Sequence, residues 1–218
     1  MYLQLTTRCN MTCAHCCFSA SHQGEDMSEE TFRKALDFAA SREEYLVLGG
    51  GEPTVHPQFL DYLGLAIVRN PMVGELPVLV VTNGKRKSIA LKLAELARNG
   101  LVQAELSVDD YHDPISEVVV QAFSSRSARD EDKLSIRSVQ RIVPVGRAIE
   151  ENVATEDTGC CCESLLVDPS GRLYACGCKT IELGTVWEPN IPEDYDCEWA
   201  HSERAQDWTA GARQPLAA

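Results

Sequence analysis

The sequence is poor in aromatic residues, in positive charge and in long apolar runs, and each shortage excludes a class of protein. Aromatic residues make up 6% of the 218 residues, although the apolar fraction of 44% is ordinary for a packed domain. Lys and Arg number 20 against 33 Asp and Glu, a net charge of -13. Tight nonspecific binding to nucleic acid is therefore not expected, because it relies on clustered positive charge.

No apolar run approaches the length of a membrane span, and the N-terminus lacks the basic and apolar regions of a secretory signal. We therefore expect a cytoplasmic protein with no membrane partner. The chain nevertheless contains 10 cysteines. In a reducing compartment such a number indicates metal centres rather than disulfides.

Three cysteines follow a short apolar strand candidate at residues 2–6. Cys9, Cys13 and Cys16 have the spacing C-x3-C-x2-C. Close spacing in one loop lets several thiolates converge on one iron–sulfur cluster, and three ligands leave one iron of a [4Fe-4S] cluster open. The alternatives are a disulfide pair or part of a zinc site, although zinc sites favour a close pair followed by a distant second pair.

A glycine-rich turn follows the next buried strand candidate, residues 45–48. The sequence there is Gly49, Gly50, Gly51, Glu52, Pro53, Thr54. Glycines after a strand let the backbone approach a ligand closely, and Glu52 adds a carboxylate. Taken alone, the pattern also fits a plain turn.

Further strand candidates end in polar residues. Residues 77–82 lead into Asn83, and residues 102–108 carry Ser107 and lead into Asp109 and His112. In β/α barrels such side chains lie at the C-terminal ends of the strands, where the chemistry is placed. His112 is a candidate for substrate orientation or proton donation, with a loop or capping histidine as the alternative.

Residues 134–143 alternate imperfectly and predict a strand with one face in a pocket, followed by Gly146, Arg147 and Ala148. Helices are predicted between the strands, among them one that begins after Ser28, which is followed by acidic residues suited to a first helical turn. The others are predicted at residues 57–69, at 88–98 and from Pro114 onward.

A second cysteine group follows Gly159. It comprises Cys160, Cys161, Cys162, Cys176, Cys178 and Cys197, and its middle contains a turn sequence, residues 168–171, between two short strands. A hairpin with thiols near its open ends can close on one metal centre. Consecutive cysteines diverge in direction, so we expect one centre held by Cys176, by Cys162 or Cys160, and by Cys178 and Cys197. A structural zinc remains the alternative to an iron–sulfur cluster.

The ordered motifs resemble the radical S-adenosylmethionine (SAM) superfamily. The resemblance implies that Cys9, Cys13 and Cys16 hold a [4Fe-4S] cluster whose open iron binds SAM, and that reductive cleavage of SAM yields a 5′-deoxyadenosyl radical that abstracts a hydrogen atom. It further implies that Gly50, Gly51, Glu52, Asn83, Ser107 and Asp109 shape the SAM site. Arg147 would pair with the SAM carboxylate, since a guanidinium can bind a carboxylate bidentately. The alternative for Arg147 is a surface residue at a turn.

The second cysteine group resembles the SPASM and twitch auxiliary cluster domains, although it has six cysteines where the full SPASM pattern has seven. The predicted fold is α/β, a partial (β/α)6 TIM-like barrel over residues 1–152, with a small cysteine-rich β-hairpin cluster domain and tail over residues 153–218. A complete eight-fold barrel needs about 250 residues, which favours the partial form.

The resemblance leaves the substrate open. Small molecules, nucleotides and peptides are all candidates, with flavodoxin or ferredoxin as electron donor. The cysteine loop begins within ten residues of Met1, so no leader-binding domain is expected ahead of it, which favours a small metabolite or nucleotide over a ribosomal peptide. The rival hypotheses are a peptide maturase and a non-catalytic iron–sulfur or zinc sensor.

Overall fold

The computed structural model describes residues 1–69, 78–124, 134–139, 141–155 and 164–192. Its strands form one sheet in the order β5-β4-β3-β2-β1-β6-β7-β8. The strands are β1 (Tyr2–Gln4), β2 (Val47–Gly49), β3 (Leu79–Thr82), β4 (Gln103–Ser107), β5 (Leu134–Arg137), β6 (Leu166–Val167), β7 (Arg172–Tyr174) and β8 (Glu182–Thr185). The helices are α1 (Glu29–Ser41), the 3-10 turn η1 (Pro53–Val55), α2 (Phe59–Arg69), α3 (Lys87–Arg98), α4 (Glu117–Ser124) and α5 (Arg147–Glu150).

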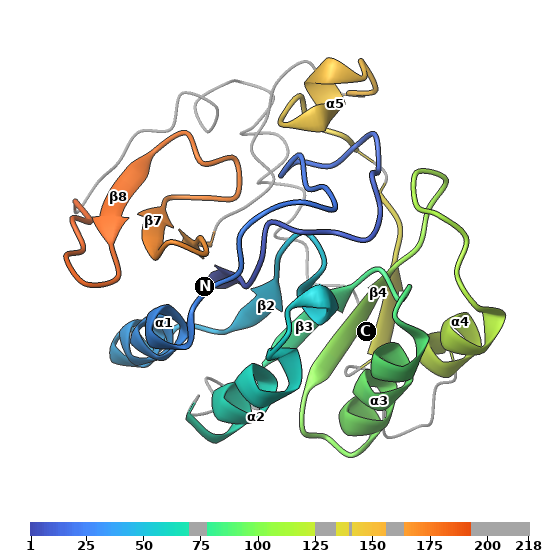
Figure 1. Cartoon of the computed structure of the whole chain (residues 1–218), viewed down its shortest axis with the longest axis horizontal. Coiled ribbons are helices and arrows are strands. Elements are labelled where there is room, and N and C mark those ends of the chain that lie inside the picture. The colour runs from blue at the N-terminus through green and yellow to red at the C-terminus, as the bar shows by residue number, and fades with distance from the viewer. Residues whose placement is uncertain (70–77, 125–133, 140, 156–163, 193–218) are drawn as a thin grey trace, which may run out of the picture.

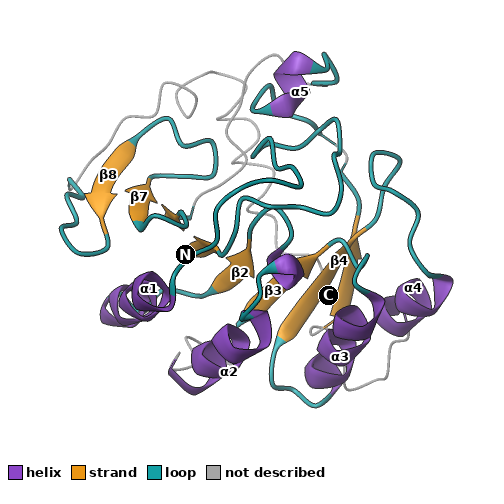
Figure 2. Cartoon of the chain, in the orientation of Figure 1, coloured by secondary structure: helices purple, strands orange, loops and turns teal. Residues whose placement is uncertain are grey.

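Strands β1 to β5 pair in parallel with their neighbours in chain order, and helices α1 to α4 cover one face of the sheet (Figures 1 and 2). This arrangement confirms the predicted α/β class, as an open sheet and not a closed barrel. Because parallel strands all end at one edge, the loops that follow β1 to β5 gather on the same side of the sheet. Among the described helices, none combines the length and the apolar character that crossing a membrane would require.

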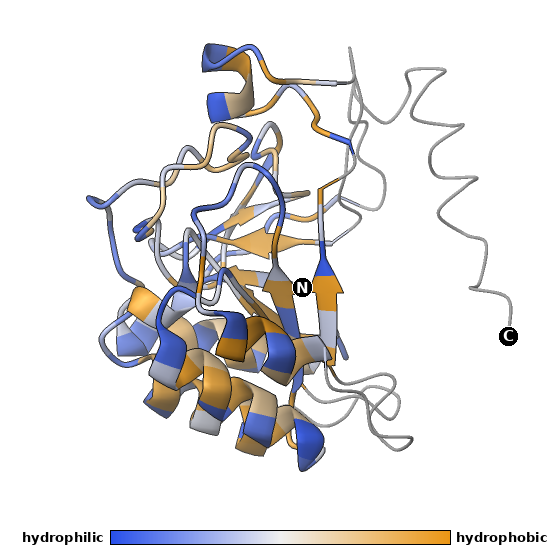
Figure 3. Ribbon diagram, turned by 90° about the vertical axis from the view of Figure 1, so that its right-hand side faces the viewer, coloured by the Kyte–Doolittle hydropathy of each residue, from blue (hydrophilic) through white to orange (hydrophobic). Residues whose placement is uncertain are grey.

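The core lies between the sheet and these helices, where apolar faces meet, as the hydropathy view in Figure 3 illustrates. Leu48 of β2 and Val80 of β3 are fully buried. The rings of Phe32 in α1 and Tyr62 in α2 stack with centroids 4.2 Å apart. Ser28 caps α1 as predicted, because its hydroxyl accepts a hydrogen bond from the amide of Thr31 at 3.1 Å.

Two expectations about strands need correction. The strand predicted over residues 134–143 ends at Arg137, and Val139, Arg141, Ile142 and Val143 beyond it line a cavity. The predicted cysteine-rich hairpin, β6 with β7, does form, but β6 pairs in parallel with β1 and so extends the same sheet. The predicted domain boundary at residue 152 stays a prediction, because residues 156–163 and 193–218 lie outside the described part of the chain.

Candidate active site

Three thiols face one cavity. The loop of residues 9–20, which we call the cluster loop, follows β1, and Cys9, Cys13 and Cys16 all line a cavity of about 340 Å³. That volume lies within the range of small-molecule sites in proteins. The structure thus brings together the three cysteines that the spacing singled out.

The thiols also receive N–H donors. The amide of Met11 points to Cys9 Sγ at 3.3 Å, and that of Ala20 to Cys16 Sγ at 3.4 Å. Burial raises the pKa of the Cys9 and Cys13 thiols to about 11. A set of half-buried thiols with amides aimed at sulfur fits an iron–sulfur cluster, because iron displaces the thiol protons and N–H donors stabilise the resulting thiolates.

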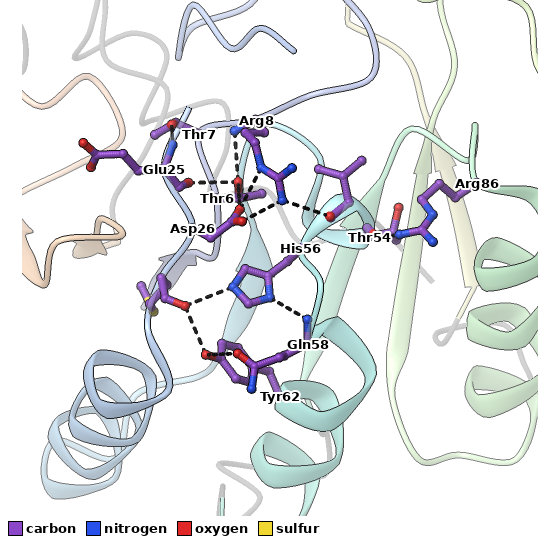
Figure 4. Close-up of polar contacts among 12 residues, drawn as sticks. Thr6, Thr7, Arg8, Glu25, Asp26, Thr54, His56, Gln58, Tyr62 and Arg86 are labelled. Atoms are coloured by element: carbon purple, nitrogen blue, oxygen red, sulfur yellow. Dashed lines mark hydrogen bonds and ion pairs between the residues drawn. The ribbon is translucent and has the colours of Figure 1, made fainter. Parts of the chain in front are cut away.

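A polar network holds the first end of the cluster loop (Figure 4). The Arg8 guanidinium pairs with both carboxylate oxygens of Asp26, at 3.0 and 2.6 Å, and also donates to the carbonyl of Val55 at 3.3 Å. The Thr6 hydroxyl donates to Asp26 at 2.6 Å. The backbone just before Cys9 is therefore tied both to the segment preceding α1 and to the turn after β2.

Glu52 is buried at the floor of the cavity, where four donors converge on its carboxylate. Oε1 accepts from the Thr54 amide at 3.1 Å, the Thr54 hydroxyl at 2.6 Å and the Thr82 hydroxyl at 2.8 Å, and Oε2 accepts from the Asn83 amide at 2.7 Å. Burial still raises the pKa of this carboxyl group above its ordinary value. The network fixes the turn after β2 against the end of β3.

The packing of the chain leaves no room for a side chain at Gly51. A Cβ on Gly51 would lie 2.4 Å from the carbonyl oxygen of Arg8 and 2.8 Å from Cβ of Ala20. The turn after β2 therefore packs directly on the backbone just before the cluster loop and on the side chain of Ala20 at its other end. Gly50 and Gly51 also line the cavity, and their contact with SAM stays a prediction.

Asn83 and Ser107 line the same cavity from the ends of β3 and β4. The Asn83 side-chain amide donates to the Asn10 side-chain oxygen at 2.9 Å and points to Cys9 Sγ at 3.7 Å. The third strand end is thus joined directly to the cluster loop.

Asp109 lies behind His112 rather than on the cavity wall. Its Oδ1 is 2.8 Å from Nδ1 of His112 and 2.9 Å from the amide of Tyr111. Burial acts to raise the pKa of Asp109, but the hydrogen bonds from His112 and the backbone outweigh it and hold the pKa below the usual range. His112 lines the cavity, with its ring 5.1 Å from that of His15. The pair is suited to orienting one imidazole toward a bound molecule.

Arg147 is placed differently from the role predicted for it. Its guanidinium donates to the carbonyl oxygen of Cys13 at 2.9 Å and to that of Ala20, and Arg147 is not among the residues that line the cavity. Two other arginines, Arg137 and Arg141, do line it. Sequence reasoning expected one face of residues 134–143 to lie in a pocket but gave neither arginine a site role, although both belong to the same alternating face.

The cavity wall also includes residues for which sequence reasoning gave no site role. Tyr2, Met11, His15 and Phe18 belong to this set. His15 lies between two predicted ligands, Cys13 and Cys16, and that position was a usable signal. Tyr2 lies on β1, and burial raises the pKa of its phenol, whose oxygen accepts from the Gly50 amide at 2.9 Å.

Two members of the second cysteine group lie in the part of the chain that the structure describes. Cys176, which is buried, and Cys178 follow β7 in the turn toward β8. Beside them, Lys179 reaches back to β1 and donates to the side-chain oxygen of Gln4 at 2.6 Å. The other predicted ligands, Cys160, Cys162 and Cys197, lie outside the described residues, so the composition of this centre stays a prediction.

Comparison with known proteins gives a consistent result. Residues 3–134 match the model of the radical SAM superfamily. The chain is 35% identical over 114 residues to the tungsten-containing aldehyde ferredoxin oxidoreductase cofactor-modifying protein of Pyrococcus furiosus, covering 50% of this chain and 30% of that protein. It is 30% identical over 149 residues to the mycofactocin maturase MftC of Mycobacterium ulcerans, covering 66% of this chain and 36% of that protein. The chain thus spans about a third of the length of these curated relatives.

Solved structures share the fold. BtrN in complex with AdoMet and 2-DOIA superposes with a TM-score of 0.62 at 15% identity, covering 96% of this chain and 84% of that one. The anSMEcpe structure with bound AdoMet and the Kp18Cys peptide superposes with a TM-score of 0.55 at 15% identity, covering 95% and 82%. At these identities the likeness establishes the fold alone.

Proposed function

Since the chain belongs to the radical SAM superfamily, whose cofactors are a [4Fe-4S] cluster and SAM, we propose that it abstracts a hydrogen atom from a substrate held at the cavity beside the cluster loop. The observation that carries the proposal is the convergence of Cys9, Cys13 and Cys16 with Glu52 and Asn83 on one cavity at the ends of parallel strands. The superfamily's cofactors, when bound, supply a 5′-deoxyadenosyl radical.

The residues have distinct roles in this proposal. Cys9, Cys13 and Cys16 would hold the cluster. The backbone of Gly50 and Gly51, together with Glu52, Asn83 and Ser107, would bind SAM, and Asp109 would act through His112. Arg137 or Arg141 is the better placed partner for the SAM carboxylate, because both residues line the cavity and a guanidinium can pair bidentately with a carboxylate.

The direct test is anaerobic reconstitution with iron and sulfide, followed by SAM and a strong reductant, with 5′-deoxyadenosine measured by mass spectrometry. Wild-type protein should form it, and Cys13→Ala should not. Cys17→Ala is the matched control for iron content, since Cys17 is adjacent to Cys16 but is not a predicted ligand. A protein that keeps its iron yet forms no 5′-deoxyadenosine would instead be the non-catalytic sensor.

Two substrate classes follow from the relatives. A small molecule is the first class, since one relative is a cofactor-modifying protein of Pyrococcus furiosus, and a nucleotide belongs with it as a compact substrate. A peptide is the second class, since the relatives include mycofactocin maturases and a putative peptide biosynthesis protein of Bacillus subtilis. Candidates of both classes, deuterated at the reacting carbon, should be incubated with the enzyme; deuterium in 5′-deoxyadenosine identifies the class.

We further propose that Cys176 and Cys178, with Cys160 or Cys162 and Cys197, hold an auxiliary iron–sulfur cluster, and that a flavodoxin or ferredoxin supplies the electron to the chain. The burial of Cys176 supports a structural thiolate there. In Cys176→Ala, reconstituted iron should fall by about half while the first cluster remains. Zinc bound in place of the missing iron in wild-type protein would favour the structural-zinc alternative.

A further inference from the structure

One residue contacts three backbone carbonyl groups of the cluster loop. The amide of Arg147 donates to the carbonyl of Cys16 at 3.0 Å, while its guanidinium donates to that of Cys13 at 2.9 Å and to that of Ala20. In Figure 1, the short helix α5, which Arg147 begins, lies beside the N-terminal loop and away from the other helices. Arg147 therefore joins a late segment of the chain to the loop that carries the thiols.

Gly146 makes this contact possible. It has a φ of +60°, and a Cβ at this position would lie 2.3 Å from the carbonyl oxygen of Cys17 and 2.7 Å from that of Cys16. Both obstacles are backbone atoms, so a side chain cannot be accommodated unless the cluster loop moves. The Gly146–Arg147 segment and the cluster loop thus fit together backbone against backbone.

The cluster loop needs such support because little within it fixes its shape. Its internal backbone hydrogen bonds are two turn contacts, from the Cys16 amide to the Cys13 carbonyl and from the Ser19 amide to the Cys16 carbonyl, each 3.2 Å long. Arg8 secures the backbone just before Cys9. Arg147 contacts the portion from Cys13 onward. Two arginines from distant parts of the sequence therefore hold the two ends of one irregular loop.

We propose that Arg147 is a positioning residue that fixes the backbone of residues 13–20, so that the thiols of Cys13 and Cys16 face the cavity together with that of Cys9. The inference rests on the proposed function only in assigning a cluster to these cysteines. It replaces the role in SAM binding that the Gly-Arg-Ala sequence suggested. The guanidinium also places a positive charge beside the proposed ligand residue Cys13, which favours an added electron on a negatively charged cluster.

Hydrogen exchange of the metal-free full-length chain tests the positioning role without any SAM chemistry. In Arg147→Gln, amides of residues 13–20 should exchange about tenfold faster or more, because two hydrogen bonds from a charged donor are lost. Arg147→Lys should show a smaller increase, since one ammonium group cannot span both carbonyls. Arg98→Lys is the matched control, because Arg98 likewise donates to a backbone carbonyl, that of Ala122, on the helical side of the molecule.

The reconstituted chain supplies a spectroscopic readout. Iron should pass to a chelator about tenfold faster in Arg147→Gln than in wild type. The midpoint potential of the SAM-binding cluster, followed by electron paramagnetic resonance, should fall in Arg147→Gln and be largely restored in Arg147→Lys, which keeps the charge. Gly146→Ala should accelerate exchange of the same loop while leaving the guanidinium in place, and it provides a second variant if Arg147→Gln folds poorly.

The results separate this inference from its rivals. Unchanged exchange of residues 13–20 in both Arg147→Gln and Gly146→Ala would overturn it. Weaker SAM affinity with unchanged loop exchange would also overturn it and return Arg147 to the SAM carboxylate. Faster exchange in a protein that forms no 5′-deoxyadenosine would contradict the proposed function but support the positioning role.

Discussion

The backbone amide of Asn83 donates a 2.7 Å hydrogen bond to Oε2 of the buried Glu52. Asn83 follows β3 and Glu52 follows β2, so one hydrogen bond joins two motifs that are 31 residues apart in the sequence. The same carboxylate also accepts from Thr82, the last residue of β3. Glu52 therefore links the ends of two neighbouring strands through hydrogen bonds, and it is also a candidate SAM-binding residue.

Glu52→Gln should destabilise the metal-free protein by about 1–3 kcal/mol. If the amide oxygen takes the position of Oε1, the NH2 group faces the Asn83 amide, so two donors meet in a buried site. The free energy of unfolding in urea measures the effect. Glu25→Gln is the control, since Glu25 is exposed and should change stability by less than about 0.5 kcal/mol. Equal stability of the two variants would refute this account of Glu52.

Phe32→Ala should cost about 3–5 kcal/mol, because Phe32 is fully buried and stacks on Tyr62 between α1 and α2. Thermal or urea unfolding would record the loss. Val68→Ala on α2 is the matched control, because Val68 is 84% exposed and should contribute little. A small effect at Phe32 would mean that the interface between these helices does not stabilise the fold.

The lowered pKa of Asp26 predicts a specific dependence of the free energy of unfolding on pH. Burial acts to raise its pKa, but hydrogen bonds from Thr6 and Arg8 and the charge of Arg8 outweigh burial, so the folded pKa lies below the unfolded value of about 4. Its stabilising contribution is therefore present above about pH 4 and is lost as the pH falls through the folded pKa. The stability difference between wild type and Asp26→Asn should accordingly shrink below about pH 4. A difference that is constant from about pH 3 to about pH 7 would contradict this.

Asp109→Asn should alter the tautomer of His112. Asp109 Oδ1 lies 2.8 Å from Nδ1 of His112 and favours a proton on that nitrogen, which leaves Nε2 as the acceptor. Nitrogen-15 spectra of the histidine side chains in metal-free protein should show mixed tautomers in the variant, and substrate turnover should fall at least about tenfold. Asp110→Asn is the control, since Asp110 is exposed. An unchanged tautomer would remove Asp109 from this role.

The sequence predicted the parallel α/β arrangement well, because buried strands and amphipathic helices have distinct local patterns. It also predicted which residues converge, since Cys9, Glu52, Asn83 and Ser107 each lie at or after a strand end, and those ends share an edge. It did not predict the partners of Arg147, because hydrogen bonds to the carbonyl oxygens of Cys13 and Ala20 depend on how two irregular loops meet. Every residue has a backbone carbonyl, so the residue types at positions 13 and 20 do not indicate that these carbonyls accept hydrogen bonds from Arg147.

The local sequence pattern also failed to predict the length of the fifth strand. Residues 134–143 alternate well enough to suggest a full strand, yet pairing with β4 ends at Arg137, opposite Ser107, the last residue of β4. Arg137 lines the cavity from the end of the strand, and Arg141 lines it from beyond the strand. The extent of a strand is set by its neighbour, which a single sequence does not reveal.

The pairing of β6 with β1 has a consequence for cutting the chain. Leu3, on the strand that precedes the cluster loop, pairs with Leu48 of β2 on one side and with Val167 of β6 on the other. A fragment that ended near residue 152 would uncover this edge of the sheet, and an uncovered apolar edge invites pairing with other copies and aggregation. Expression of such a fragment would therefore yield aggregation-prone protein, so the two cysteine groups must be studied in one polypeptide.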